Sequence, residues 1–274
     1  MPELPEVETI ARSLSTPTKK EFSILGRKIE RVEIFWERSI ETSSAAEFKK
    51  RCEGQIIQEV YRRGKYLGLT LSTDTLLFHL RMSGTLYLQA AAVYEIKKHV
   101  RLVFHLENEL NLIFEDPRKF CRVWLLADPQ QELGDLGPEP LSDALTVEHF
   151  FAMLKNTKRR LKPLLMDQTF LAGLGNIYTD EALFKAKLHP LTPADDLSYE
   201  QAEVLLQAIR ETLEEGIQRN GASIDWVYRG GDFQNHFCVY GKEGKPCLVC
   251  GTPIRKIVVG QRGTHFCPHC QKEK

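Results

Sequence analysis

The chain has 274 residues, of which 42% are hydrophobic and 27% charged. This composition is typical of a globular protein with two domains, each large enough to bury its own core. Lys plus Arg and Asp plus Glu both total 37, so net charge gives no indication of a nucleic-acid partner. No apolar run reaches the roughly 18 residues of a membrane span, and the acidic start is atypical of a signal peptide. We expect a cytoplasmic protein without a membrane partner.

The first half begins with a helical pattern at residues 5–15 and continues as short β-branched and aromatic runs. Turn residues separate several of these runs, as between strands. Eight runs have strand length: 28–36, 55–63, 65–71, 74–82, 85–91, 99–107, 110–116 and 121–127. Such a series is typical of a β-sandwich or barrel.

The second half has apolar residues at helical intervals over 145–157, 177–187 and 198–221. A stretch rich in acidic residues and Pro at 128–143 separates the halves, which indicates an interdomain connection. Basic residues gather at 155–162 and 255–274, although such runs are usually solvated faces. We therefore expect an α+β protein with an N-terminal helix and β-sandwich domain (1–127), a linker (128–144), a helical domain (145–234) and a C-terminal finger (235–274).

Two CxxC pairs near the end of the chain, CLVC and CPHC, are sixteen residues apart. Four thiolates in this spacing supply the closed tetrahedral site that one structural zinc prefers. The flanking segments have the length of a β-hairpin, so the pattern indicates a zinc ribbon. Two redox or disulfide pairs are the alternative, and His265 and His269 could compete as ligands. The expected ligands are Cys247, Cys250, Cys267 and Cys270.

Seven motifs together carry a resemblance to a known family: MPELPEVET at the start, then RRGKYLGL, HLRMSGTL, DPRKF, LGPEPLSD, GLGNIYTDEALF and GQRGTHFCPHCQ. In this order they closely resemble bacterial formamidopyrimidine-DNA glycosylases, which excise 8-oxoguanine and ring-opened purines and then cut the strand at the abasic site. The motifs span essentially the whole chain. The resemblance implies a helix–two-turn–helix module, a zinc finger, and a monomer that binds damaged double-stranded DNA, associated with the nucleoid through this substrate.

The resemblance implies four catalytic residues. Pro2, as the terminal residue after loss of Met1, attacks C1′ and forms an imine; a free α-amine has a pKa near 8, so much of it is neutral. Glu3 acts as general acid and base, although a carboxylate in a first helical turn is more often a cap. Lys65 assists the eliminations, and Arg262 contacts phosphates and assists the second elimination.

The resemblance also implies residues that bind DNA. Three side chains fill the gap left when the damaged nucleotide flips out of the stack: Met82, Arg118 and Phe120. As an alternative, Met82 and Phe120 could be ordinary core residues, and His79 a buried structural histidine. The expected phosphate or backbone contacts are His79, Lys97, Lys158 and Asn176.

The chain departs from the family pattern at several positions. Arg81 and Cys121 stand where glycines are common, and Lys97 stands where a histidine is common. The segment 220–237 replaces a longer glycine- and threonine-rich loop that covers the flipped base. These departures leave the preferred lesion open.

Two other functions remain as alternatives. An endonuclease VIII-like enzyme would use the same proline on oxidised pyrimidines, but PELPE rather than PEGPE at the start favours purines. A zinc-ribbon protein that only recognises lesions would not need Pro2, Glu3 and Lys65.

Overall fold

The computed structural model describes residues 1–16, 23–93, 95, 97–223 and 230–273. These residues form two compact units. We call Met1–Gly134 with Asn220–Gly231 the sandwich unit, and Asp135–Arg219 with Asp232–Lys274 the helical–ribbon unit. The four segments expected from the sequence divide the chain differently and stay a prediction.

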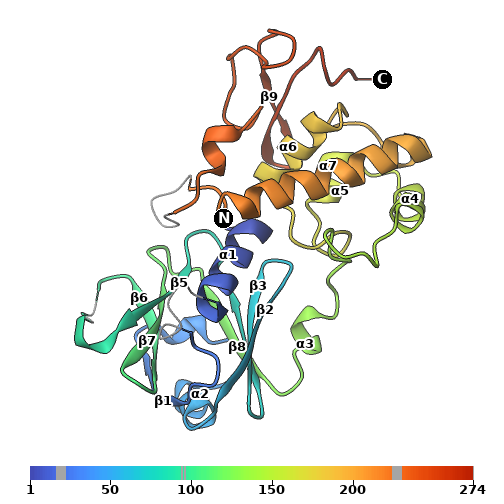
Figure 1. Ribbon diagram of the computed structural model, residues 1–274. Coiled ribbons are helices and arrows are strands. Elements are labelled where there is room, and N and C mark those ends of the chain that lie inside the picture. The colour runs from blue at the N-terminus through green and yellow to red at the C-terminus, as the bar shows by residue number, and fades with distance from the viewer. Residues whose placement is uncertain (17–22, 94, 96, 224–229, 274) are drawn as a thin grey trace. The chain divides into compact units, whose positions relative to one another are not determined.

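The sandwich unit contains two four-stranded antiparallel sheets, with strand orders β1-β6-β7-β5 and β2-β3-β4-β8 (Figure 1). Every strand-length run in the sequence forms one of these strands, and the expected α+β class with a β-sandwich is confirmed. The strands are β1 (Ile29–Ile34), β2 (Ile57–Arg63), β3 (Tyr66–Leu71), β4 (Thr75–His79), β5 (Thr85–Ala90), β6 (Val100–Leu106), β7 (Leu110–Glu115) and β8 (Arg122–Leu126).

Aromatic rings join the two sheets at the centre of the core. The ring of Phe78 on β4 meets the rings of Phe104 on β6 and Phe114 on β7 edge-on, with centroids 5.8 and 5.3 Å apart. Edge-to-face pairs of this kind contribute beyond the area that they bury. The sandwich is therefore a rigid base for the loops at its ends.

Helix α1 (Leu4–Ser15) packs its apolar face on β2, β3 and β5. This packing positions the N-terminus of the chain at the sandwich. The unit also contains four short elements: α2 (Ala45–Cys52), α3 (Gln130–Leu133) and the 3₁₀ turns η2 (Glu37–Ser39) and η3 (Ala91–Val93).

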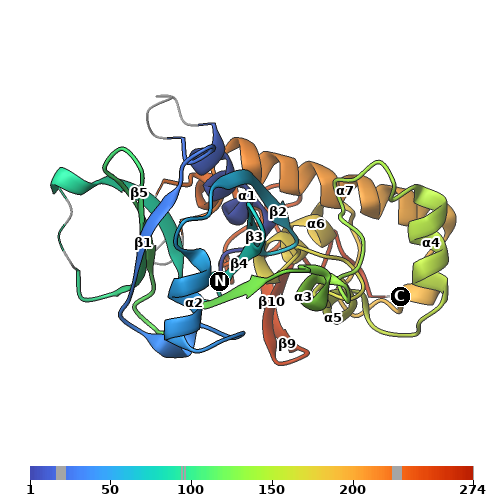
Figure 2. The same ribbon diagram turned by 90° about the horizontal axis from the view of Figure 1, so that it is seen from below.

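The helical–ribbon unit is built around α6 (Asn176–Lys185), which is buried from Ile177 to Phe184 because α5, α7 and β10 all pack against it. The ribbon of β9 and β10 is seen from below in Figure 2. The other elements are α4 (Val147–Lys155), α5 (Leu161–Leu165), α7 (Tyr199–Gln218), β9 (Arg255–Val259), β10 (Arg262–Phe266), η4 (Ala194–Asp196) and η5 (Phe233–His236).

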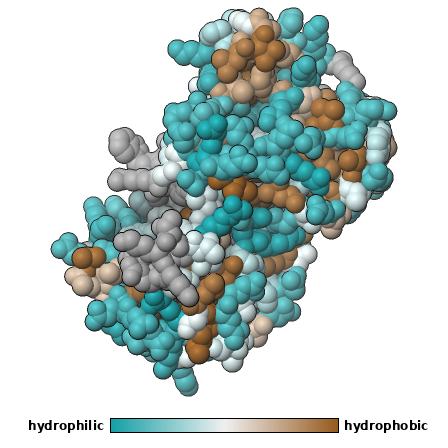
Figure 3. All heavy atoms as spheres, viewed as in Figure 1, coloured by the Kyte–Doolittle hydropathy of each residue, from teal (hydrophilic) through white to brown (hydrophobic). Residues whose placement is uncertain are grey.

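Hydrophilic side chains cover much of the face shown in Figure 3, and apolar side chains gather at the ribbon end. The C-terminal finger has three strongly exposed apolar side chains: Leu248 (70%), Val249 (68%) and Val258 (77%). Among the described helices, none is both long and apolar enough to cross a membrane.

Candidate active site and DNA interface

Pro2 and Glu3 are buried at the start of α1. Glu3 caps this helix: its carboxylate accepts from the Glu6 backbone N–H, while Glu6 Oε2 accepts from the Glu3 N–H at 2.7 Å. The structure therefore shows the capping contact, and a catalytic role for Glu3 stays a prediction.

Glu6 also holds the segment that enters the sandwich unit near residue 220. Its Oε1 accepts from the Ala222 N–H at 2.7 Å. At Gly221, φ is +79° and a Cβ atom would lie 2.6 Å from Glu6 Oε1, so only glycine fits there. One buried carboxylate thus fixes both the N-terminus and the start of the 220–237 segment. Residues 224–229 of that segment lie outside the described residues, and its role stays a prediction.

Lys65 is buried in the turn between β2 and β3, and His79 is buried at the end of β4. The Arg81 N–H donates to His79 Nδ1 at 3.0 Å, so the proton of the neutral ring lies on Nε2. Burial, together with the nearby charges of Arg81 and Lys65, lowers the pKa of His79 from its ordinary value to about 3. A neutral imidazole with an Nε2–H is a hydrogen-bond donor suited to a phosphate oxygen. Lys65 and His79 are therefore close enough for the lysine charge to affect the histidine pKa.

We expect the free energy of unfolding to fall as the pH drops from about 6.5 toward 3. The pKa of His79 is depressed in the folded state, so only the unfolded chain binds the proton in this window. The slope from this group is about 1.4 kcal/mol per pH unit. Urea titrations at several pH values give the free energy of unfolding of the protein and of His79→Gln. The difference between the two pH dependences is the contribution of His79. Parallel profiles would contradict a neutral buried His79.

The residues expected to fill the gap in the DNA lie on two loops of the sandwich unit. Met82, between β4 and β5, is half-buried, and Arg118 and Phe120, between β7 and β8, are exposed. The Arg118 guanidinium lies 5.0 Å from the centroid of the Phe120 ring. Phe120 is 46% exposed, which excludes the core alternative for this residue. Lys97 is exposed ahead of β6.

The structure shows how the chain accommodates two of its departures from the family pattern, Arg81 and Cys121. Arg81 has φ +53°, a left-handed conformation that favours glycine, so the arginine there is held under backbone strain. Cys121 is fully buried, and its N–H donates to the Asp116 carboxylate at 2.7 Å. The larger side chain at 121 is thus absorbed by the core, while the one at 81 points to the surface.

In the helical–ribbon unit, Asn176 and the ribbon are joined directly. Asn176 is the first residue of α6, and its Nδ2 donates to the Gly263 carbonyl at 3.1 Å. Its Oδ1 is buried and has no hydrogen-bond partner among the described residues. Arg262 is exposed beside Gly263, directly after a two-residue turn in which Gly260 and Gln261 both have positive φ. The helix N-terminus and Arg262 therefore form one surface suited to a phosphate. Lys158 is exposed before α5.

A buried ion pair holds this surface in place. Lys162 Nζ contacts Asp180 Oδ1 and donates to the Asn176 carbonyl at 2.9 Å, and both charged side chains are fully buried. Asp180 Oδ2 accepts from the His265 N–H at 2.9 Å and lies 3.3 Å from His265 Nδ1. Asp180 thus joins α5, α6 and β10. His265 is engaged with this carboxylate, and His269 is exposed.

The four cysteines of the two CxxC pairs meet at one point. Their Sγ atoms all lie within 4.8 Å of one another, with 3.9 Å between Cys247 and Cys270 and 3.5 Å between Cys250 and Cys267. Zn–S bonds of about 2.3 Å in a tetrahedron place sulfur atoms about 3.8 Å apart. The donor set and spacing fit one structural zinc, as the sequence predicted.

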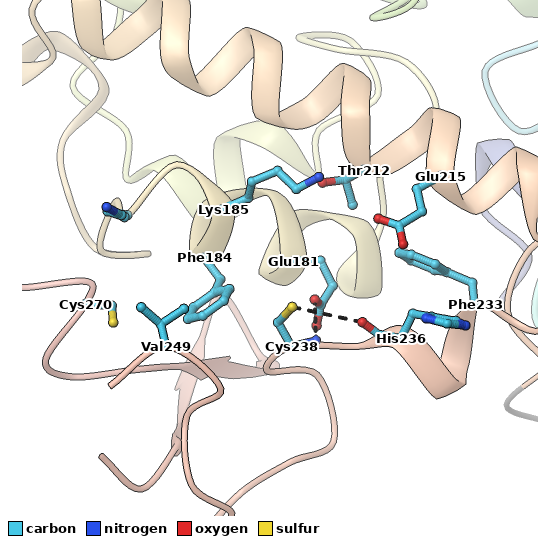
Figure 4. A pocket seen from close by; sticks show the side chains of 11 residues that line it. Glu181, Phe184, Lys185, Thr212, Glu215, Phe233, His236, Cys238, Val249 and Cys270 are labelled. Atoms are coloured by element: carbon cyan, nitrogen blue, oxygen red, sulfur yellow. Dashed lines mark hydrogen bonds between the residues drawn. The ribbon is translucent and has the colours of Figure 1, made fainter. Parts of the chain in front are cut away.

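Another carboxylate fastens the finger to α6. Glu181 is buried, and it accepts from the N–H groups of Cys238, Val239 and Tyr240 at 2.7, 3.0 and 2.8 Å; Figure 4 shows its side chain directed toward Cys238. A cavity of about 250 Å³ lies beside it, and among the expected site residues only Cys270 lines this cavity. The cavity is therefore separate from the expected chemistry.

Sequence reasoning missed the residues that support the site. Four such residues are buried: Asp116, Lys162, Asp180 and Glu181. The last three pair with residues 18 to 85 positions away, so no local pattern marks those pairings. Asp116 had one local signal, because an Asp before Pro is typical of a turn in which the side chain caps the backbone.

Comparison with known proteins assigns the chain to a family. Three family models match: the formamidopyrimidine-DNA glycosylase N-terminal domain over 1–123, the H2TH domain of the same glycosylase over 136–227, and a zinc finger found in FPG and IleRS over 244–272. The chain belongs to the formamidopyrimidine-DNA glycosylase family. It is therefore a DNA glycosylase that acts on damaged DNA, and the resemblance inferred from its motifs is confirmed.

Relatives of this family match over their full length. Formamidopyrimidine-DNA glycosylases of Protochlamydia amoebophila and Roseiflexus sp. are 43% and 44% identical, over 100% and 99% of this chain and 100% of each relative. A crystal structure of Lactococcus lactis FPG (MutM) with Fapy-dG DNA has 38% identity and a TM-score of 0.90, over 99% of this chain and 100% of that one. The wild-type Lactococcus enzyme has also been solved, with equal identity, coverage and TM-score, on DNA containing an oxidised pyrimidine.

Proposed function

We propose that the chain, as a monomer, excises oxidised purines, namely 8-oxoguanine and formamidopyrimidines, from duplex DNA and then cuts the strand by β,δ-elimination. The burial of Pro2 and Glu3 beside Glu6 is the observation that carries this proposal, because it holds the Pro2 nitrogen, which becomes an amine once Met1 is lost, and one carboxylate in a single geometry. We further infer that it acts in the bacterial cytoplasm, on the nucleoid, since the relatives above are bacterial.

In the proposed mechanism, the free Pro2 amine attacks C1′ and the glycosidic bond breaks. Glu3 supplies and takes up protons as the base departs and the sugar ring opens. The sugar is then bound to Pro2 as an iminium, whose positive charge acidifies the neighbouring carbon. Loss of a proton there breaks the C3′–O bond, and a second elimination breaks the C5′–O bond; Lys65 assists these steps and Arg262 holds the phosphates. Zinc, when bound, supplies only the fold of the finger that carries Arg262.

Glu3→Gln is expected to slow release of an intact damaged base by about a hundredfold or more, the usual contribution of a general acid–base group. It should largely spare cleavage at a preformed abasic site, where no base has to leave. Single-turnover rates on the two substrates measure the difference. Glu8→Gln is the matched control, because Glu8 lies on the same helix and pairs with Arg12 and Arg62 instead. Equal losses on both substrates would indicate a capping role alone.

Removing the Arg262 side chain should weaken DNA binding mainly at low salt, where the contribution of each phosphate contact is largest. The arginine is exposed at the ribbon tip, and each phosphate contact contributes about one unit to the slope of log affinity against log salt. We expect Arg262→Ala to lower that slope by about one. Lys256→Ala, on the adjacent strand and 4.0 Å from Glu243, is the control. An unchanged slope in Arg262→Ala would place this residue off the DNA path.

A second lesion class has specific support. The structure of the Lactococcus relative was solved with DNA containing an oxidised pyrimidine. The purine and pyrimidine alternatives therefore differ in which damaged bases are released, and both use the same reaction at Pro2. Release rates for 8-oxoguanine, formamidopyrimidines and dihydrothymine from matched duplexes decide the preference. Faster release of dihydrothymine would overturn the purine assignment.

A further inference from the structure

The two loops that carry Met82, Arg118 and Phe120 are both strained. Arg81 and Lys119, one in each loop, have φ of +53° and +61°. Left-handed backbone at residues other than glycine is unfavourable and persists only where surrounding contacts enforce it. Some part of the fold must therefore hold these loops in place.

The Asp116 carboxylate provides this restraint and is completely buried. Its Oδ1 accepts from the Ser83 hydroxyl and from the Arg118 N–H at 3.0 Å. Its Oδ2 accepts from the N–H groups of Phe120 and Cys121 at 2.6 and 2.7 Å. Four donors thus converge on one carboxylate, and three of them come from the loop that carries Arg118 and Phe120.

The backbone of Asp116 is itself fixed to the sheet that contains β6. Its N–H donates to the His99 carbonyl at 2.9 Å, and its carbonyl accepts from Arg101 Nε at 2.7 Å. The carboxylate is therefore held at a fixed position between the two loops. Among the described residues of the Met82 loop, only Ser83, which is adjacent to Met82, forms a hydrogen bond with this carboxylate.

The side chains on these loops gain little support from the core. Phe120 is 46% exposed, and Arg118 lies over its ring rather than in a buried ion pair. Their positions consequently depend on the backbone that Asp116 holds. Groups whose positions are fixed before binding lose less entropy when they enter DNA.

We propose that Asp116 and Ser83 are positioning residues that couple the two loops, so that Met82 enters the DNA stack in concert with Arg118 and Phe120. This inference rests on the proposed function, in which these three side chains fill the gap left by the flipped nucleotide. The Ser83–Asp116 contact is the coupling element, because within the described part of the chain it is the hydrogen bond that joins the Met82 loop to the carboxylate that shapes the other loop.

Stopped-flow fluorescence of 2-aminopurine beside an 8-oxoguanine measures opening of the duplex directly. We expect Ser83→Ala to slow opening about tenfold, the effect of losing one charge-assisted hydrogen bond. Ser83→Thr should restore opening because it keeps the hydroxyl. Borohydride trapping on a single-stranded abasic site, which needs no duplex opening, should be unchanged in Ser83→Ala. Phe120→Ala serves as the reference variant for insertion.

Each outcome separates the coupling from the function on which it rests. Normal opening in Ser83→Ala with slow opening in Phe120→Ala would overturn the coupling and leave the insertion role intact. Normal opening in Phe120→Ala would overturn the insertion role itself, and the coupling with it. Equal losses of opening and of single-strand trapping in Ser83→Ala, without rescue by Ser83→Thr, would indicate general damage to the fold and would also overturn the coupling.

Discussion

Converting the Pro2 nitrogen into an amide should abolish the covalent protein–DNA adduct that borohydride traps. A chain that retains Met1, or carries added residues ahead of Pro2, has no lone pair available on that nitrogen for attack on C1′. We expect base release and strand cleavage to fall on the order of a thousandfold or more, as when other catalytic nucleophiles are removed. Mass spectrometry of the trapped complex should place the adduct of the active protein on Pro2 of a chain that lacks Met1.

Pro2→Gly is the informative control, because after loss of Met1 it still offers a primary amine. A primary amine forms an imine that is charged only when protonated, whereas proline forms an iminium that stays positively charged. The glycine variant should therefore still be trapped but should carry out the eliminations more slowly. An adduct on Lys65, together with full activity in a protein that retains Met1, would show that the first residues act only as a helix start.

Elements with a strong local pattern could be predicted from the sequence. The strand-length runs all form strands because alternating or continuous apolar residues must be buried in one of the two sheets. Helix α2 (Ala45–Cys52) was missed because it is only 8 residues long. Its signal was present: Ser44 caps the helix by accepting from the Glu47 N–H, in the order Ser-x-x-Glu. Helix α5 was missed because Pro163 lies in its first turn, where proline is tolerated.

The site could be predicted only where chemistry and sequence position coincide. Four thiolates in two CxxC pairs need each other, so their meeting point follows from spacing alone. In contrast, Glu6 and Ala222 are 216 residues apart, and Asp180 and His265 are 85 apart. Such pairs are determined by how the helices and sheets pack, and a single chain carries no local mark of them. The roles of the DNA-contacting residues accordingly came from the family motifs and stay predictions.

Loss of one zinc ligand should unfold the finger and abolish DNA binding. The finger shares a small apolar cluster with α6, and two of the buried members, Cys247 and Cys267, are themselves expected ligands. Binding of a structural zinc supplies about 10–16 kcal/mol in small fingers, far more than such a cluster can contribute. We expect Cys267→Ser to lower bound zinc from one per chain to none, measured by elemental analysis, and to eliminate binding to a lesion duplex.

Cys238→Ser is the matched control for this prediction. Cys238 packs against the same cluster, but burial raises the pKa of its thiol to about 11, and it is not among the four clustered sulfur atoms. This variant should keep both zinc and DNA binding. The sandwich unit should stay folded in Cys267→Ser, because the described residues of the core between its sheets include none from the finger. An active preparation of Cys267→Ser, or one with full binding but no zinc, would mean that the finger holds Arg262 in place without the metal.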